Sequence, residues 1–188
     1  MTIGIAGPSA SGKTTIARLL EERHGAERMR YSEILAELAK ERGEDANDKK
    51  VLQDLFVSVR QERGENWLTD LIMEFVQEVN APHLVIEGNR RKVDIDTLRK
   101  VAALRNEPLK FVFIDASPDE RFSRYNLDPK AHGYEPVTRE EFEALEKAPT
   151  EDEIGYLRDF AKAEGIYINT DNCDVEDTFK MVEEALGL

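Results

Sequence analysis

The sequence predicts a three-layer α/β/α fold, in which a five-stranded parallel sheet lies between two layers of helices. Five short apolar runs alternate with amphipathic helical patterns along the 188 residues, the order that parallel strands with helical crossovers require. The runs are almost continuously apolar, as expected of strands that are buried on both faces. No internal repeat and no long linker interrupts the alternation. The expected strands are 3–6, 29–31, 83–87, 111–115 and 166–168.

The bulk composition bounds the class of protein. Hydrophobic residues make up 40% of the chain and charged residues 35%, which is ordinary for a globular domain and too apolar for a disordered one. The length suits one core, so residues 1–188 are expected to form a single domain. The formal net charge of −13 argues against nucleic acid or an anionic membrane as partners, because both bind basic surfaces.

The cysteine count and the first residues bear on location. Cys173 is the only cysteine, so no disulfide can form within the chain, and a reducing compartment fits. Met1 leads directly into an apolar run without a basic leader. No apolar stretch approaches the roughly 20 residues of a membrane span. We therefore expect a cytoplasmic protein, either a monomer or a homodimer.

Local signals support the helical segments. Lys13 to His24 carries apolar residues on one face and stops at Gly25, a residue that often ends helices. Further amphipathic patterns cover 34–39, 51–59, 67–79, 95–105 and 175–186. A serine or threonine three residues before a glutamate marks three helix starts. These pairs are Ser117 with Glu120, Thr138 with Glu141, and Thr150 with Glu153.

Two segments depart from the alternation of strand and helix. Residues 32–80 form a long helical region between the second and third expected strands. Residues 125–137 have no periodicity and contain Pro129, Gly133 and Pro136. Because an aperiodic segment in a compact domain is more often functional than idle, we interpret residues 125–137 as a short lid.

The strongest motif is "GPSASGKT", which fits the pattern G-x-x-x-x-G-K-[ST] and lies between a strand and a helix. Glycines let backbone N–H groups approach a phosphate, and the helix that follows adds its free N–H groups and positive dipole end. Lys13 would reach the β- and γ-phosphates of ATP, and the Thr14 hydroxyl would bind Mg²⁺. GTP remains an alternative donor. The expected nucleotide-binding residues are Gly7, Ser9, Ala10, Ser11, Gly12, Lys13, Thr14 and Thr15.

The third strand ends in "VIEGNRR". Glu87 stands where an acid is expected beside the phosphate loop. It could hold a water of Mg²⁺ or take the proton of the acceptor, and the plainer alternative is a loop carboxylate. Arg90 just beyond can fork onto a phosphate.

The fourth strand leads into "SPDERFSRY". Arg121 and Arg124 lie three residues apart on one helix face and lead into the expected lid. Arginines that a lid brings onto the γ-phosphate neutralise developing charge. The alternative is surface ion pairs with Asp119 or Glu120.

Polar residues in and around the helical region are candidates for the phosphate acceptor. They are Tyr31, Ser32 and Arg60. Arg60 ends the apolar stripe 51–59, so its stem can be buried while its head faces a cleft. No Asn-Lys-x-Asp motif of the guanine-reading kind is present, since "NTDN" at 169–172 differs from it.

Taken in order, these motifs resemble the P-loop nucleoside-monophosphate-kinase superfamily. They are closest to the adenylate-kinase-like group that holds dephospho-CoA kinases and deoxynucleoside monophosphate kinases. The motifs are the phosphate loop, "YSEILAELAKERG", "VRQERG", "VIEGNRR", "IDASPDERFSRY" and "INTDN". The phosphate-loop text is also similar to uridine and cytidylate kinases.

The resemblance implies transfer of the γ-phosphoryl group of ATP with Mg²⁺, a helical acceptor-binding region over 32–80 and a lid. It places Arg60 and Arg90, with Asn89 beside them, at the acceptor. It places Arg121 and Arg124 over the donor phosphates, and Asn169 and Asn172 near the donor base. The chain departs from many relatives in having "EGN" after the third strand, and its lid has only Lys130 and His132 as basic residues.

Three functions fit the sequence. The first is a kinase of a nucleotide-like acceptor: a nucleoside monophosphate, a deoxynucleoside monophosphate or dephospho-CoA. The second is a kinase of a neutral acceptor such as a nucleoside. The third is a non-catalytic ATP-binding sensor or assembly factor.

Overall fold

The computed structural model describes residues 1–64, 66–127, 136–147 and 151–188. Its centre is one sheet of five parallel strands in the order β2-β3-β1-β4-β5, which confirms the predicted α/β fold. The first strand lies in the middle, so the loop that follows it opens at the centre of the sheet. The strands are β1 (Thr2–Ala6), β2 (Glu27–Arg30), β3 (Leu84–Asn89), β4 (Leu109–Asp115) and β5 (Ile166–Asn169).

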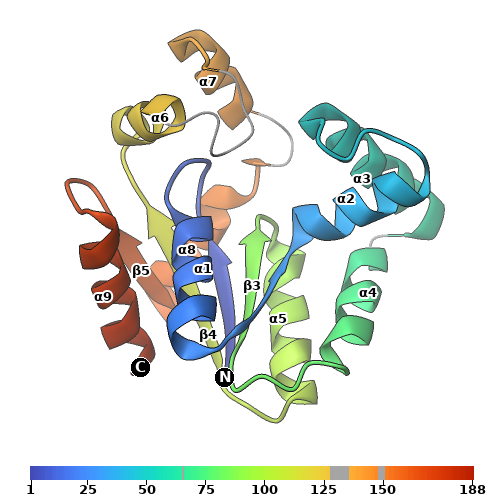
Figure 1. Ribbon diagram of the computed structural model, residues 1–188, viewed down its shortest axis with the longest axis horizontal. Helices are drawn as coiled ribbons and strands as arrows, with labels where there is room; N and C mark the ends of the chain where they lie inside the picture. The colour runs from blue at the N-terminus through green and yellow to red at the C-terminus, as the bar shows by residue number, and fades with distance from the viewer. Residues whose placement is uncertain (65, 128–135, 148–150) are drawn as a thin grey trace.

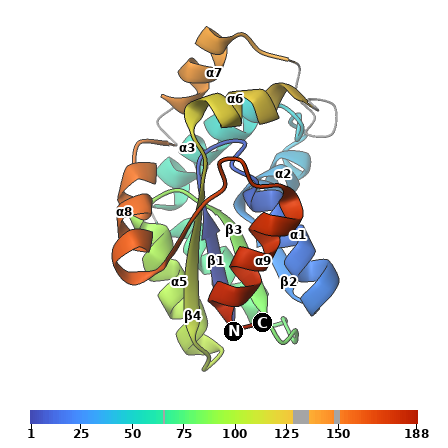
Figure 2. The ribbon, with the colours of Figure 1, turned by 90° about the vertical axis from the view of Figure 1, so that its left-hand side faces the viewer.

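Helices cover both faces of the sheet and complete the three layers (Figure 2). On one face α1 (Lys13–His24) packs against α9 (Val175–Leu186). The other face carries α5 (Lys92–Leu104) and α8 (Ile154–Glu164). Each face needs its own cover because both faces of the strands are apolar.

Alternation along the strands divides the core into two clusters. Ile3 and Ile5 of β1 point to the α1 and α9 side, together with Val112 and Ile114 of β4. The residues between them face the opposite side, where Leu98 of α5 packs. This period of two is the expected geometry of a β-strand.

Helix α5 approaches the middle strand closely at Gly4. A Cβ atom on Gly4 would lie 2.3 Å from Cδ1 of Leu98. Glycine at this position therefore lets α5 sit directly on the centre of β1.

All five strands differ from their predicted bounds; β1, β4 and β5 are only one or two residues longer at one end, and the other two differ more. The second was expected at 29–31, but β2 is Glu27–Arg30 and Tyr31 begins the next helix. Only Met29 of β2 is buried, so the apolar signal was too weak to locate the strand. The third was expected to stop before Gly88, yet β3 continues to Asn89 through a register shift opposite Ile5 and Ala6. Gly88 makes this bulge with a φ of 89°.

Two groups of helices rise above the carboxyl ends of the strands (Figure 1). The first group, from the 32–80 region, is α2 (Tyr31–Glu41) and α3 (Lys49–Arg63), whereas the third helix of that region, α4 (Trp67–Val76), lies beside α5 at the level of the sheet (Figure 1). Helix α4 stops three residues before the predicted end at Val79. On the other side lie α6 (Pro118–Leu127) and α7 (Arg139–Glu146). Both groups therefore flank the edge at which the phosphate loop opens.

The expected lid, 125–137, is described only at its ends, since 128–135 lie outside the described residues and include Lys130 and His132. The two ends are joined, because the Asn126 side chain accepts from Val137 N at 2.9 Å and donates to Val137 O at 3.1 Å.

The caps at Ser117 and Thr138 are present, with the backbone N–H of Glu120 or Glu141 donating to the hydroxyl at 3.3 Å in each case. Thr150 of the third predicted cap lies outside the described residues. Within the described parts of the chain no helix is long and apolar enough to cross a membrane.

Candidate functional site

The phosphate loop joins β1 to α1 and is shaped by two glycines. Gly7 has a φ of 149°, and a Cβ there would lie 2.2 Å from the carbonyl oxygen of Ile114. Any other residue would push the loop away from β4. Gly12 has a φ of 94° where α1 begins, and Ala10 has a φ of 61°. These left-handed conformations curl the backbone in the manner that phosphate loops require.

The residues of the loop differ in their exposure and in their hydrogen bonds. Lys13 is 8% exposed, and its Nζ donates to the carbonyl of Pro8 at 2.9 Å. Ser11 is 1% exposed, and its hydroxyl makes no hydrogen bond within the described parts of the chain. Ser9 contributes its carbonyl to Arg121, and Thr15 is exposed on the first turn of α1.

Glu87 lies at the carboxyl end of β3, directly beside this loop, and is fully buried. Its Oε2 accepts from the Thr14 hydroxyl at 2.8 Å. Its Oε1 accepts from Nη1 of Arg28 on β2 at 2.7 Å. Sequence reasoning paired Glu87 with Thr14 through a metal and missed Arg28.

This arrangement suits Mg²⁺. In the described parts of the chain no group of three or more His, Cys, Asp or Glu side chains could hold a metal, so an all-protein cage is absent there. Nucleotide-bound Mg²⁺ needs less, because phosphate oxygens and waters supply most ligands. One hydroxyl, from Thr14, held by one carboxylate, from Glu87, fits that need.

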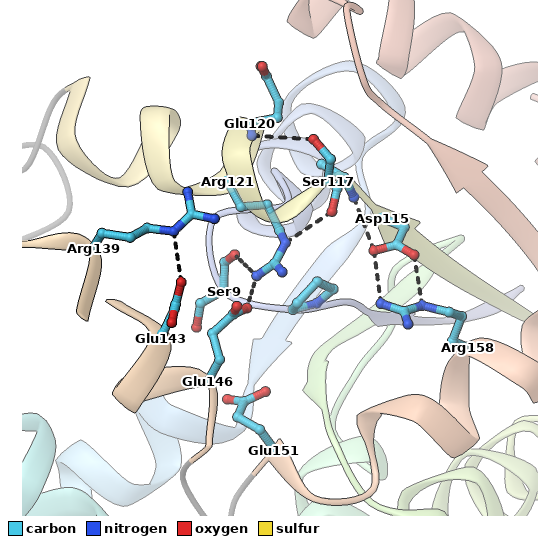
Figure 3. Close-up of polar contacts among 12 residues, drawn as sticks. Ser9, Asp115, Ser117, Glu120, Arg121, Arg139, Glu143, Glu146, Glu151 and Arg158 are labelled. Atoms are coloured by element: carbon cyan, nitrogen blue, oxygen red, sulfur yellow. Dashed lines mark hydrogen bonds and ion pairs between the residues drawn. The ribbon is translucent and has the colours of Figure 1, made fainter. Parts of the chain in front are cut away.

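Arg121 reaches from α6 to the phosphate loop (Figure 3). Its Nε donates to Ala116 O at 3.0 Å and its Nη1 to Ser9 O at 3.4 Å. The same Nη1 contacts the carboxylate of Glu146, which ends α7. The guanidinium therefore lies at the loop and in contact with a carboxylate.

Arg124 lies one turn further along α6 and points to the β5–α9 loop. It donates to the hydroxyl and carbonyl of Thr170 at 2.8 and 2.7 Å, and to Glu120 at 2.9 Å. These bonds tie α6 to the end of β5. The structure thus gives Arg124 the ion pair that the sequence offered as its alternative.

Arg90 follows β3 and contacts Glu151, which precedes α8 and is 9% exposed. The turn that carries Arg90 is held by Asp94, whose Oδ2 accepts from Arg90 N at 2.8 Å and from Arg91 N at 2.9 Å. Burial raises the pKa of Asp94, although these two bonds act against it. Asp94 was missed because a buried cap looks like any helical aspartate in sequence.

Tyr31 and Asn89, two expected acceptor residues, are buried and bonded to each other. Asn89 accepts from the Tyr31 hydroxyl at 3.2 Å and donates to Ile5 O and Ile86 O at 3.0 and 2.7 Å. Burial, with a smaller effect of Asp94, raises the pKa of Tyr31 well above its usual value. This hydrogen-bonded pair joins the start of α2 to the carboxyl ends of β3 and β1.

The cavity beside Tyr31 has a volume of about 10 Å³, enough for one water molecule. Its lining comes from α2, α4 and the start of α5 and includes Thr69, Asp94 and Thr97. The hydroxyls of the two threonines are hydrogen-bonded at 2.8 Å. This cavity is far too small for a nucleotide, so it does not mark the acceptor position.

The remaining predicted residues lie further apart. Ser32 is half-buried on the first turn of α2, and Arg60 is exposed on the last turn of α3. Asn169 and Asn172 are exposed at the end of β5, where Asn169 accepts from Asp171 N at 2.8 Å. In turn Asp171 accepts from Ser117 N at 2.7 Å.

Asp115, at the carboxyl end of β4, was also missed. It is 6% exposed and accepts from Arg158 of α8 and from the Tyr167 hydroxyl. Figure 3 shows this ion pair beside the Arg121 cluster. An acid at the end of a buried strand was the available signal, the same one that identified Glu87.

The sequence and the fold were compared with known proteins. Residues 6–143 match a family model described as an AAA domain (AAA_17). No curated protein matches the chain.

Several solved structures share the fold over nearly their whole length. TT1252 from Thermus thermophilus is 20% identical with a TM-score of 0.58, covering 99% of this chain and 95% of that one. An uncharacterised protein from Eubacterium ventriosum is 16% identical with a TM-score of 0.58, covering 100% and 98%. A protein described as a "putative kinase" from Chloroflexus aurantiacus is 14% identical with a TM-score of 0.56, covering 98% and 97%.

Proposed function

Because the chain belongs to this AAA-domain family of P-loop kinase-like proteins, we propose that it is a small-molecule kinase acting on a nucleotide-like acceptor. The donor would be ATP with Mg²⁺. One observation carries the proposal: Thr14 of the phosphate loop donates to the fully buried carboxylate of Glu87 at 2.8 Å. A chance glycine turn would not need an acid at that place.

Phosphoryl transfer needs positioning and charge neutralisation more than covalent chemistry. The loop N–H groups and Lys13 would hold the donor phosphates, and Thr14 with Glu87 would hold Mg²⁺. When bound, the ion supplies charge neutralisation at the β- and γ-phosphate oxygens. Arg121 already lies against the loop through Ser9, where it can meet charge that develops on the transferred group.

The acceptor side rests on Arg90. Arg90 follows the end of β3, three residues after Glu87. It lies in a turn that the Asp94 carboxylate holds by two hydrogen bonds from backbone N–H groups. A guanidinium at this place suits the phosphate of a nucleotide-like acceptor. The contact between Arg90 and Glu151 favours a phosphorylated acceptor over a neutral one, since a site that holds a carboxylate can hold a phosphate.

The deciding experiment is a phosphotransfer screen of ATP and Mg²⁺ against all nucleoside monophosphates, the common nucleosides and dephospho-CoA. We expect one phosphorylated acceptor, and Lys13→Ala should lower its turnover on the order of 10²–10³-fold. Lys100→Ala, on an exposed face of α5, is the matched control and should keep full turnover. Near-native turnover of Lys13→Ala would contradict the proposal. ATP binding without any phosphorylated product would favour the sensor.

A further inference from the structure

Arg28 is the unexplained charge next to the nucleotide site. It lies in the middle of the edge strand β2, yet its side chain is only 14% exposed. Strand edges commonly carry charges that face solvent. This one turns inward to the carboxyl end of β3 instead.

Three carboxylates surround the guanidinium. Nη1 donates to Glu87 at 2.7 Å, Nη2 donates to Glu33 of α2 at 2.9 Å, and Nε lies 3.6 Å from Glu21 of α1. Burial tends to lower the pKa of Arg28, but Glu33 and Glu87 raise it overall. The group is thus a fixed cation joined to three elements.

Glu87 depends on this cation physically. A fully buried carboxylate is costly unless an opposite charge and hydrogen bonds compensate it. Of the two oxygens, Oε1 bonds Arg28 and Oε2 bonds Thr14. With both ends held, the carboxylate plane has one orientation, and that orientation sets where the Thr14 hydroxyl points.

We propose that Arg28 is a positioning residue of the metal–nucleotide site, which acts by holding Glu87 so that Thr14 is presented to Mg²⁺. The inference rests on the proposed function, because it presumes a nucleotide at the loop. Groups that orient the ligands of a metal commonly change its affinity 10- to 100-fold when they are removed.

The same geometry bears on the role of Glu87. An oxygen engaged by Arg28 and another engaged by Thr14 are poorly placed to remove a proton from an acceptor. In the proposed arrangement Glu87 supports Thr14 and does not act as a base.

The chain offers a matched control on the same strand. Arg30 is two residues further along β2, shares the strand face of Arg28, and is opposite Glu87 in the register of the two strands. It makes neither a hydrogen bond nor an ion pair with Glu87. Arg30→Met thus removes an arginine of the same strand without removing the contact.

The test measures binding of a fluorescent ATP analogue with Mg²⁺ and with EDTA, so it needs neither an acceptor nor turnover. In Arg28→Met we expect the Kd in EDTA to stay within about 2-fold and the tightening by Mg²⁺ to fall about 10-fold. Arg28→Lys keeps the charge and should recover part of that loss. Arg30→Met should bind as the wild type does.

The outcomes separate the inference from its premise. An unchanged Mg²⁺ effect in Arg28→Met, or equal weakening with and without Mg²⁺, would overturn the positioning role. If Arg28→Met fails to fold, Arg28→Lys decides: a reduced Mg²⁺ effect supports the role and a wild-type effect overturns it. Wild-type protein that binds the nucleotide tightly but transfers no phosphoryl group would overturn the proposed kinase and leave Arg28 in place.

Discussion

At the scale of single residues, the arginines of the site are already engaged. Arg90 contacts Glu151, Arg121 contacts Glu146, and Arg28 contacts Glu87. A guanidinium that is largely removed from water needs a partner charge. A phosphate that binds Arg90 or Arg121 therefore has to displace a carboxylate, and its extra charge favours that exchange.

Arg90 gives the prediction that separates a phosphorylated acceptor from a neutral one. Arg90→Ala removes a charge-assisted hydrogen bond to the acceptor, worth about 1.5–3 kcal/mol. It should therefore raise the acceptor KM about 10- to 100-fold and leave the KM for ATP unchanged. Steady-state kinetics on the acceptor found in the screen checks this. Glu151→Gln breaks the same ion pair but keeps the guanidinium, so its acceptor KM should not rise. An unchanged acceptor KM in Arg90→Ala would point to the neutral acceptor.

At the scale of elements, the end of α7 and the residues just before α8 place two carboxylates near Arg121, which contacts the phosphate loop. Glu146 closes α7, and Glu151 precedes α8. Both lie near the cluster around Arg121 (Figure 3). The position of α7 is thus linked to the charge of the donor site.

This link predicts that releasing Arg121 strengthens ATP binding. Glu146→Gln removes the charge that competes with phosphate, so the KM for ATP should fall about 2- to 5-fold, the effect of about 0.5–1 kcal/mol. The measurement is the KM for ATP in the transfer assay. Glu143→Gln, which loses only the exposed pair with Arg139, is the control. A KM that rises in Glu146→Gln would show that Glu146 holds Arg121 in its working position.

At the scale of the whole molecule, an ion cluster closes the end of the sheet opposite the phosphate loop. Glu107 accepts from Arg105 Nε at 2.6 Å and from the Thr2 hydroxyl at 2.7 Å, and it lies 3.3 Å from the Met1 amine. The contacts tie the start of β1 to the turn before β4. Burial alone would raise the pKa of Glu107, but these partners hold it below its usual value.

The lowered pKa sets the sign of a stability effect. The ionised group stabilises the fold above the unfolded pKa of 4.5, and this is lost as the pH falls through the lower folded value. At pH 7 Glu107→Gln should lower the free energy of unfolding by about 1–2 kcal/mol, and the gap to the wild type should close below pH 4.5. Urea unfolding at pH 7 and below pH 4.5 measures the difference in the free energy of unfolding between Glu107→Gln and the wild type. Exposed Glu78→Gln should show no gap, and a gap that widens in acid would contradict the assignment.

Sequence alone predicted the elements whose signals are local. The alternation of apolar runs gave the parallel sheet, the motif at Gly7–Thr14 gave the loop, and Ser117 and Thr138 gave helix starts. Where the signal was weak, as in β2 with its single buried residue Met29, the bounds were wrong.

The sequence by itself identified Gly7, Lys13 and Thr14. These residues act through the shape of the backbone and through positions that are close together in the chain. Tertiary structure decided the partners. Arg28 lies 59 residues from Glu87, and Arg121 lies 25 residues from Glu146. Ion pairs over such separations depend on which strands and helices become neighbours. No local pattern encodes that choice, because many carboxylates could have met each arginine and only the packed sheet selects one.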